Sequence, residues 1–235
     1  MDILLTGASR GIGEATARKI AEKGEHRLFL VARNQQKLNK LKSRIELINP
    51  HSEVHVLALD LSENVSYPGI REYLATHCPA LDILINNAGT VIVKPFEELD
   101  EKDVDMHFRV NYMAPALLTR ELLPLLKKSV HPHVVNISSM SGFQGSQKFP
   151  GLTHYSASKA ALASLTECLS VEFKGTISFN ALCIGAVQTE MLAQAFPGFK
   201  APVDPDRMGE YIAEFALTAH YIMNGKVLPL SMSAP

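Results

Sequence analysis

The stretch DILLTGASRGIGEATARKIAEKG, residues 2–24, decides the fold class of this chain. A short apolar run leads into a turn that contains Gly7, Gly11 and Gly13, and a segment with apolar residues at helical spacing follows. Glycines in a strand-to-helix turn let backbone N–H groups approach a pyrophosphate at the positive end of the helix. The GxxxGxG spacing alone also fits a turn that binds nothing, but its position directly after the first strand favours a nucleotide site.

Strand-like and helix-like segments alternate along the rest of the chain. The strand-like runs are almost continuously apolar, which is typical of strands covered on both faces. We predict strands at residues 2–6, 27–32, 53–59, 82–86, 133–138, 176–183 and 226–230, and helices at residues 12–23, 35–47, 69–76, 96–128, 154–174 and 206–223. This alternation predicts an α/β fold: a single Rossmann-type, doubly wound parallel sheet of about seven strands with helices on both faces.

Length and composition narrow the class of protein further. The 235 residues are enough for one substantial domain, so we predict a single dinucleotide-binding and catalytic domain over residues 1–235. Lys and Arg number 23 against 24 for Asp and Glu, which argues against a surface that binds nucleic acid. The three cysteines (Cys78, Cys168 and Cys183) form no CxxC pair, so we expect neither a disulfide scaffold nor a metal site, and a reducing compartment.

The sequence also carries expectations about location. No apolar run approaches the ~20 residues of a membrane span. The first residues, MDILLTG, place an acid where a secretory signal has positive charge. We therefore expect a cytoplasmic protein that has no contact with the membrane.

Two arginines indicate which nucleotide the glycine turn binds. A site for NAD carries Asp or Glu about 20 residues beyond the glycines, where the acid binds the ribose hydroxyls. This chain has Arg33 at that place and no acid, and Arg10 lies in the turn itself. A carboxylate would repel the 2′-phosphate of NADP(H), whereas guanidinium groups bind it through charge-assisted hydrogen bonds. Two exposed arginines without a ligand are the alternative, but their joint occurrence favours NADP(H).

Three further segments fall at the carboxyl ends of predicted strands, where sheets of this kind bind ligands. Asp60-Leu61 is placed to hydrogen-bond an adenine. In 86–89, the small residues Ala88 and Gly89 permit close approach, and the Asn side chains tie neighbouring loops together. The segment 185–189 is placed to hold a carboxamide through backbone and hydroxyl groups. Each segment alone is more often an ordinary turn; their shared location is what favours a site.

A tyrosine and a lysine are the candidate reacting groups. Tyr155 and Lys159 lie four residues apart, so on a helix they occupy one face. A nearby ammonium and an oxidised nicotinamide both favour the phenolate and lower the tyrosine pKa from its usual ~10. Such a tyrosine exchanges a proton with a carbonyl oxygen as hydride moves. Ser139 is placed to donate a hydrogen bond to that oxygen, and Asn111 to hold a water that links Lys159 to solvent. Taken alone, a YxxxK pair is more often an ordinary surface pair.

Together these motifs resemble the short-chain dehydrogenase/reductase family. TGASRGIG (6–13), DL (60–61), NNAG (86–89), VN (110–111), NISS (136–139), YSASK (155–159) and IGAVQTEM (184–191) occur in the family's order over nearly the full chain. The resemblance implies a catalytic tetrad of Asn111, Ser139, Tyr155 and Lys159. It implies cofactor contacts at Gly7, Ser9, Arg10, Gly11, Ile12, Gly13, Arg33, Asp60, Leu61, Asn86, Ala88, Gly89, Tyr155, Lys159, Val187 and Thr189. Family members often pair through two long helices, so we expect a homodimer through helices near 111–128 and 154–174.

The sequence therefore predicts a short-chain oxidoreductase that reduces a ketone or aldehyde with NADPH, or runs the reverse reaction, with Tyr155 as general acid and base. A non-catalytic NADP(H)-binding sensor is the alternative, although it has no use for four tetrad residues. An epimerase or dehydratase would carry a larger substrate region. The substrate is not defined; its selection is expected from loops near 140–154 and 190–206. Because the first of these loops is longer than usual in the family, Ser138 and Ser141 compete with Ser139 for the serine role. Ile184 stands where the family usually has proline.

Overall fold

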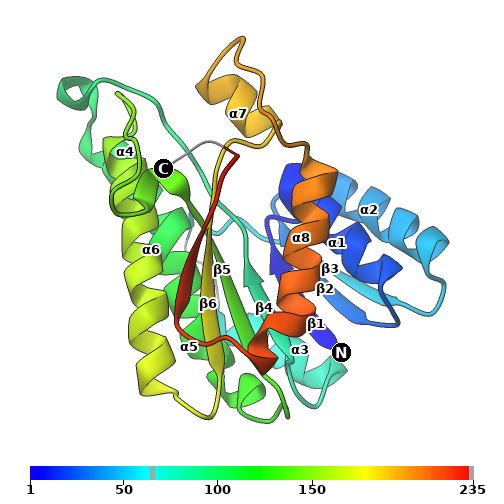
Figure 1. Cartoon of the computed structure of the whole chain (residues 1–235). Coiled ribbons are helices and arrows are strands. Elements are labelled where there is room, and N and C mark those ends of the chain that lie inside the picture. The colour runs from blue at the N-terminus through cyan, green and yellow to red at the C-terminus, as the bar shows by residue number, and fades with distance from the viewer. Residues whose placement is uncertain (64–66, 233–235) are drawn as a thin grey trace.

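A parallel sheet of seven strands runs through the computed structural model, which describes residues 1–63 and 67–232 (Figure 1). The strand order is β3-β2-β1-β4-β5-β6-β7, and all six neighbouring pairs are parallel. The strands are β1 (Asp2–Thr6), β2 (Arg27–Ala32), β3 (Glu53–Ala58), β4 (Ile83–Asn86), β5 (His133–Ser139), β6 (Ser178–Ile184) and β7 (Lys226–Leu230). The doubly wound parallel sheet expected from the sequence is confirmed.

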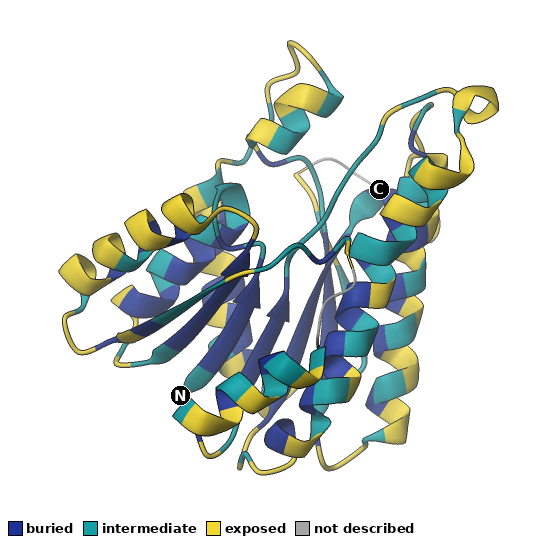
Figure 2. Cartoon of the chain, turned by 180° about the vertical axis from the view of Figure 1, so that it is seen from behind, coloured by how far each residue is buried: buried dark blue, intermediate teal, exposed yellow. Residues whose placement is uncertain are grey.

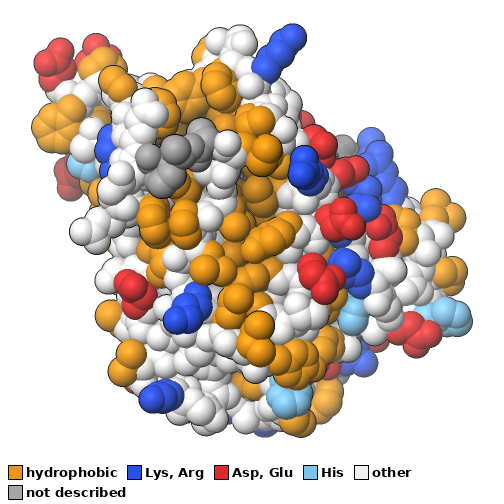
Figure 3. All heavy atoms as spheres, viewed as in Figure 1, with side chains coloured by type: hydrophobic (Ala, Val, Ile, Leu, Met, Phe, Trp, Pro, Cys, Tyr) orange, Lys and Arg blue, Asp and Glu red, His pale blue; other side chains and the backbone are white. Residues whose placement is uncertain are grey.

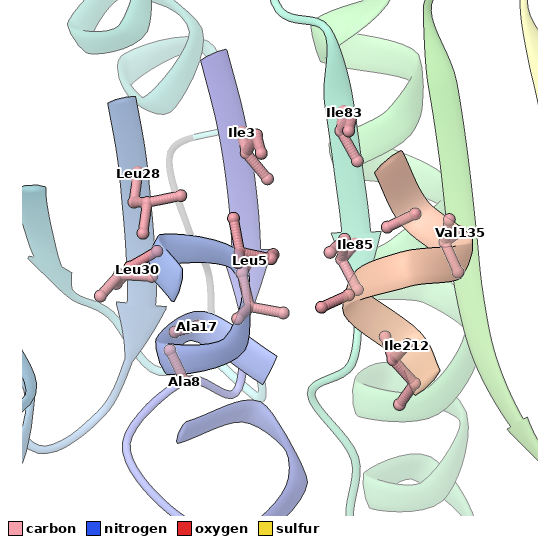
Figure 4. Packing of buried hydrophobic residues seen from close by; sticks show 14 of the residues in the cluster. Ile3, Leu5, Ala8, Ala17, Leu28, Leu30, Ile83, Ile85, Val135 and Ile212 are labelled. Atoms are coloured by element: carbon pink, nitrogen blue, oxygen red, sulfur yellow. The ribbon is translucent and has the colours of Figure 1, made fainter. Parts of the chain in front are cut away.

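Helices cover both faces of this sheet (Figure 2). One hydrophobic core lies under α1, α2 and α8, and a second lies under α3 and α5. Alternate residues of β1 face opposite cores: Ile3 and Leu5 point to the first, shown in Figure 4, and Leu4 points to the second. The helices are α1 (Gly11–Glu22), α2 (Gln35–Ile48), α3 (Tyr67–His77), α4 (Glu101–Phe108), α5 (Ala114–Leu126), α6 (Thr153–Glu172), α7 (Glu190–Ala195) and α8 (Pro205–Thr218). Burial on both faces explains why the strands are apolar without alternation.

The long helix expected at 96–128 is wrong as a single element. A short 3-10 turn at Phe96–Glu98 is followed by α4, a π-helical turn at Arg109–Met113, and α5. A capping box starts α4, because the side chains of Asp100 and Asp103 each accept a hydrogen bond from the other's backbone N–H. Pro115, in the first turn of α5, has no N–H to donate to the carbonyl four residues earlier, so a regular α-helix cannot continue through this point.

The helix expected at 206–223 ends at Thr218, where a 3-10 turn at Ala219–Tyr221 follows. Two other boundaries differ from the expectation for local reasons. The strand expected at 176–183 begins at residue 178, because the N–H groups of Thr176 and Ile177 donate to Phe173 O and close the end of α6. Within the segment expected as a loop at 190–206, six residues form α7, which is N-capped where Thr189 Oγ1 accepts a hydrogen bond from Leu192 N at 3.2 Å. This short helix stands above the carboxyl edge of the sheet (Figure 1).

The topology leaves one crevice for a ligand. The chain builds β1, β2 and β3 toward one edge and then crosses back, so that β4 pairs with β1 on its other side. In open α/β sheets, the ligand binds at the carboxyl ends of the strands where the order reverses. The loops after β1 and β4 flank that point.

Gly209 allows α8 to pack against α1 without a side chain between them. A Cβ on Gly209 would lie 2.7 Å from the backbone carbon of Ala15, so a larger residue forces the helices apart. We expect Gly209→Val to lower the free energy of unfolding by about 2–3 kcal/mol, as overpacking usually does. Denaturant unfolding checks this, with Arg207→Val on the exposed part of the same helix as the control. Equal losses in the two variants would contradict the close-packing argument.

The buried His133 makes the stability of the fold sensitive to acid. The ring is fully buried; its Nδ1–H donates to Ala216 O at 2.9 Å, and its Nε2 accepts from Asn180 Nδ2 at 3.0 Å, so the site holds the neutral form. Burial lowers the pKa of His133 from 6.5 to about 4. Between pH 4 and pH 6.5, His133 is protonated in the unfolded chain but neutral in the folded protein. The stabilisation is therefore complete above pH 6.5 and is lost as the pH falls toward 4.

For one buried histidine, the free energy of unfolding falls by about 3 kcal/mol as the pH falls through this range. Urea unfolding at a series of pH values, with wild type and His133→Gln compared, measures it. The acid-induced loss is expected to be smaller in His133→Gln by roughly that amount, whereas His51→Gln, at an exposed site, should follow the wild type. Parallel pH curves for wild type and His133→Gln would contradict the prediction.

Candidate active site

A cleft of about 480 Å³ opens at the carboxyl ends of the strands, at the crevice that the topology creates. Most of the predicted cofactor residues line it. They come from the turn after β1, the ends of β2, β3 and β4, helix α6 and the start of α7. The lining includes Gly7, Ser9, Arg10, Gly11, Ile12, Gly13, Arg33, Asp60, Leu61, Ala88, Gly89, Tyr155, Lys159 and Thr189.

Two of the predicted cofactor residues lie outside this cleft. Asn86 is buried beneath it, where its Nδ2 donates to Asn136 Oδ1 at 2.8 Å and to Thr119 Oγ1 at 3.3 Å. Val187 is also buried and lines the neighbouring pocket. At the NNAG loop it is Asn87 that lines the cleft.

The glycine turn packs closely on the NNAG loop, since a Cβ on Gly7 would lie 2.8 Å from Ala88 Cα. A Cβ on Gly13 would lie 2.2 Å from Gly7 O, and Gly7 itself has a φ of +70°, which disfavours any other residue. Asn87 Nδ2 donates to the carbonyls of Thr6 and Gly7 at 3.0 and 3.3 Å. Thr6 Oγ1 accepts from the backbone N–H groups of Asn87 and Ala88, each at 3.0 Å. The turn thus leaves a bare backbone surface that fits a pyrophosphate.

Arg33 and Asp60 meet at the adenosine end of the cleft. Arg33 Nη1 lies 3.7 Å from Asp60 Oδ2, and the arginine side chain is 70% exposed. Burial raises the pKa of Asp60, but hydrogen bonds from Ser62 and the charge of Arg33 outweigh this and leave it below its usual value. Asp60 is therefore ionised near neutral pH, and Arg33 remains accessible to an anion.

Arg10 is held more tightly than Arg33. Its Nη1 lies 2.8 Å from Glu190 Oε2, at the start of α7, and Lys37 Nζ lies 3.8 Å from the other oxygen of the same carboxylate. Arg10 and Glu190 are 180 positions apart in the chain, so no local pattern could have found the pair. Glu190 lines the cleft and forms an ion pair with Arg10, one of the two arginines predicted to bind a phosphate.

The reacting groups lie on α6 and at the end of β5. Lys159 Nζ donates to Ile137 O at 2.8 Å, and burial lowers the pKa of Lys159 to about 8. Burial raises the pKa of Tyr155, and its hydrogen bond with Ser139 lowers it by less. The expected lowering of the tyrosine pKa by Lys159 is therefore not seen in the protein alone; burial dominates.

The serine alternatives differ in their hydrogen bonds. The hydroxyl of Ser138 donates to Lys159 O at 2.8 Å and is buried. Ser139 Oγ accepts from the backbone N–H and the hydroxyl of Ser141, at 3.2 and 3.0 Å, so its own proton remains for another acceptor. A Cβ on Gly142 would lie 2.7 Å from the carbonyl carbon of Lys159, so this glycine lets the serine turn pack directly on α6. The contacts favour Ser139 over its neighbours.

Asn111 lies fully buried in the π-helical turn. Its Nδ2 donates to Thr90 O and to Ser158 Oγ, each at 3.0 Å, and its Oδ1 accepts from Thr90 N at 2.9 Å. Ser158 Oγ in turn donates to Tyr155 O at 2.7 Å. The amide therefore ties the loop after β4 to the helix that carries the tyrosine. Only one lone pair of Oδ1 remains for the predicted water.

A second pocket of about 270 Å³ adjoins the cleft, and Tyr155 lines both cavities. Ser139 and Ser141 line this pocket at the same end. Much of the remaining wall comes from the two segments predicted to select the substrate, which contribute Phe149 and Phe196. Hydrophobic side chains gather on the surface around α7, above these cavities (Figure 3).

Among residues 1–63 and 67–232, no group of three or more His, Cys, Asp or Glu side chains is arranged to hold a metal ion. In the same part of the chain, each helix is too short or too polar to span a bilayer.

A nucleotide-binding α/β fold with a Tyr–Lys pair at its cleft defines the class of protein, and comparisons with known proteins agree. The profile of the short chain dehydrogenase family matches residues 2–198. Fatty acyl-CoA reductase of Acinetobacter baylyi is 34% identical over 193 residues, 81% of this chain and 63% of that protein. Retinol dehydrogenase 12 of Bos taurus is 33% identical over 204 residues, 83% of this chain and 64% of that protein. The chain thus spans less than two thirds of either relative.

A solved short-chain dehydrogenase from Shigella flexneri, in complex with NADP, superimposes with a TM-score of 0.88 at 28% identity, covering 97% of this chain and 95% of that one. The chain belongs to the short-chain dehydrogenase/reductase family and is an oxidoreductase of that family.

Proposed function

We propose that this protein reduces a ketone or aldehyde to an alcohol with NADPH, or catalyses the reverse reaction. The observation that carries the proposal is the position of Tyr155, which lines both the cofactor cleft and the adjoining pocket and is hydrogen-bonded to Ser139. A carbonyl oxygen placed at this junction meets two hydroxyl groups and an adjacent cofactor site. A bound dihydronicotinamide supplies the hydride.

Each residue of the tetrad has a role that its contacts support. Ser139 uses its acceptor capacity on Ser141, so its own proton is available to Tyr155 in the free protein and to a substrate oxygen that takes this place. Tyr155 has a raised pKa and is protonated at neutral pH, as the donor in a reduction must be. Lys159, with a pKa of about 8, lies one turn of α6 from Tyr155, and its ammonium group is proposed to stabilise the tyrosinate that forms. Asn111 fixes the position of α6 through Ser158.

The cofactor is proposed to be NADP(H). Gly7 and Gly13 line the cleft at the start of α1, where backbone N–H groups can bind a pyrophosphate, and the turn packs too closely on Asn87 and Ala88 to admit larger residues. Arg33 and Arg10 both line the cleft where a 2′-phosphate would lie. The related structure from Shigella flexneri in complex with NADP supports the same assignment.

We further propose a homodimer and a single catalytic domain over residues 1–235. Ala157, Ala160 and Ser164 are exposed on one face of α6, and such small side chains allow a second copy to pack closely through α5 and α6. The three free thiols, of Cys78, Cys168 and Cys183, support a reducing compartment such as the cytoplasm.

The purified protein should consume NADPH in the presence of ketones or aldehydes, with the alcohol identified as the product. Loss of the NADPH absorbance over a panel of ketones, quinones, pterins and acyl thioesters measures this. Tight NADPH binding with no turnover across the panel would instead favour a non-catalytic NADP(H) sensor.

A further inference from the structure

We propose that the substrate is an uncharged carbonyl compound with an apolar body, bound with its carbonyl at Tyr155 and Ser139 and its body against the side chains of Phe149 and Phe196. This inference rests on the proposed carbonyl chemistry and adds the substrate class. It concerns the pocket of about 270 Å³ beside the cofactor cleft, hereafter the substrate pocket.

The walls of the substrate pocket are apolar except at one end. Among the residues that the structure describes, none with a charged or imidazole side chain lines it. Its hydroxyl groups belong to Ser139, Ser141, Tyr155 and Thr189. The first three form the reacting end, and Thr189 Oγ1 accepts the capping hydrogen bond from Leu192 N. The pocket therefore offers hydrogen bonds to one polar group of a ligand and apolar contact to the rest.

Most residues of the apolar walls come from the segments 140–154 and 190–206 and from the end of β6, and Ile12 and Val91 complete the walls. The larger apolar side chains include Met140, Phe149, Leu152, Ile184, Met191, Leu192, Phe196 and Phe199. The rings of Phe149 and Phe196 meet edge to face with centroids 6.2 Å apart, a favoured geometry for aromatic pairs. Phe149 and Phe199 are about half exposed, at 48% and 51%. An apolar ligand packed against Phe149 and Phe199 would remove their exposed surface from water, which drives binding.

The basic side chains near the substrate pocket are directed elsewhere. Lys148, next to Phe149, donates through Nζ to Phe143 O at 2.7 Å and to Ser146 Oγ at 2.8 Å. Lys200 is exposed and is not among the lining residues. A carboxylate or phosphate carried into this pocket would lose its hydration and meet no cation, which is costly in an apolar site. The pocket therefore selects against charged substrates.

Matched pairs of ketones test the substrate class. We would compare propiophenone with its para-carboxylate, and a straight-chain methyl ketone with the same ketone bearing a terminal carboxylate, using NADPH and the full-length protein. We expect kcat/KM for each neutral ketone to exceed that of its carboxylate by about 100-fold or more, as for an unpaired charge in an apolar pocket. Equal values, or a preference for the carboxylates, would overturn the inference and leave the carbonyl reductase proposal standing.

Two substitutions by arginine distinguish the effect of a charge inside the substrate pocket from the effect of a charge on the protein surface. Phe196→Arg places a cation in the pocket wall and should reduce the neutral-to-carboxylate ratio at least tenfold. Phe96→Arg adds the same charge at a ring that is 67% exposed and outside the pocket lining, so the ratio should not change. Equal changes in both variants would mean that surface charge, and not the pocket, sets the preference.

Calorimetry measures the binding of each ketone and each carboxylate to the NADPH-loaded protein. It tests the apolar substrate pocket separately from the proposed carbonyl reduction. If no ketone turns over but the neutral member of each pair binds and the carboxylate does not, the carbonyl reductase proposal fails and the apolar pocket stands. If the carboxylates bind as tightly as the neutral ketones, the apolar pocket is overturned whatever the activity.

Discussion

Replacing Tyr155 by Phe is expected to lower kcat for carbonyl reduction by about 10²–10⁴-fold, the usual contribution of a positioned general acid. The phenol is the proton donor closest to the junction of cleft and pocket, and its raised pKa keeps it protonated in the reductive direction. The phenyl ring fills nearly the same space, so the apolar walls and the hydrogen bonds of Lys159 are preserved. NADPH affinity should therefore change little.

Steady-state rates and NADPH fluorescence titrations measure the two quantities separately. Tyr211→Phe is the matched control, since that tyrosine lies on α8, is 44% exposed and lines neither cavity. A Tyr155→Phe variant that retains wild-type kcat would refute the proposed proton transfer. An equal loss in Tyr211→Phe would trace the effect to folding rather than to chemistry.

The fold could be predicted from the sequence because the five inner strands are buried on both faces, which leaves a continuous apolar signal. The start of α4 and the interruption before α5 also have local signals, the Asp100–Asp103 capping box and Pro115 respectively, but an unbroken apolar pattern conceals them. The end of α6 was less predictable. There, Thr176 and Ile177 have strand-like side chains, yet their N–H groups are used to close the helix.

The sequence motifs predicted which segments form the site, but they did not predict all the contacts that individual side chains make there. The glycine turn and the YxxxK pair are local, and the structure places them around one cleft. At NNAG, the direction of alternate side chains decides which Asn reaches the cleft: Asn86 points into the protein and Asn87 lines the cavity. The carboxylate of Glu190 reaches Arg10 only through the placement of α7, which depends on the tertiary fold.

Replacing Arg33 by Asp is expected to shift the ratio of kcat/KM for NADPH over NADH toward NADH by about 100-fold or more. A hydrogen bond to a charged group contributes roughly 1.5–3 kcal/mol, and each 1.4 kcal/mol is a factor of about ten. The substitution removes that attraction and adds repulsion between a new carboxylate and the 2′-phosphate. The new acid also stands where NAD-binding proteins hold the ribose hydroxyls.

Arg33 should affect the preference more than Arg10 does, because the two arginines differ in how freely they meet a phosphate. Arg33 is 70% exposed and 3.7 Å from Asp60, whereas Arg10 is 36% exposed and paired with Glu190 at 2.8 Å. Lys40→Asp makes the same charge change on the exposed face of α2, outside the cleft, and should leave the ratio unchanged. If Arg33→Asp leaves the ratio at its wild-type value, the 2′-phosphate is bound elsewhere and the assignment of NADP(H) to these arginines is wrong.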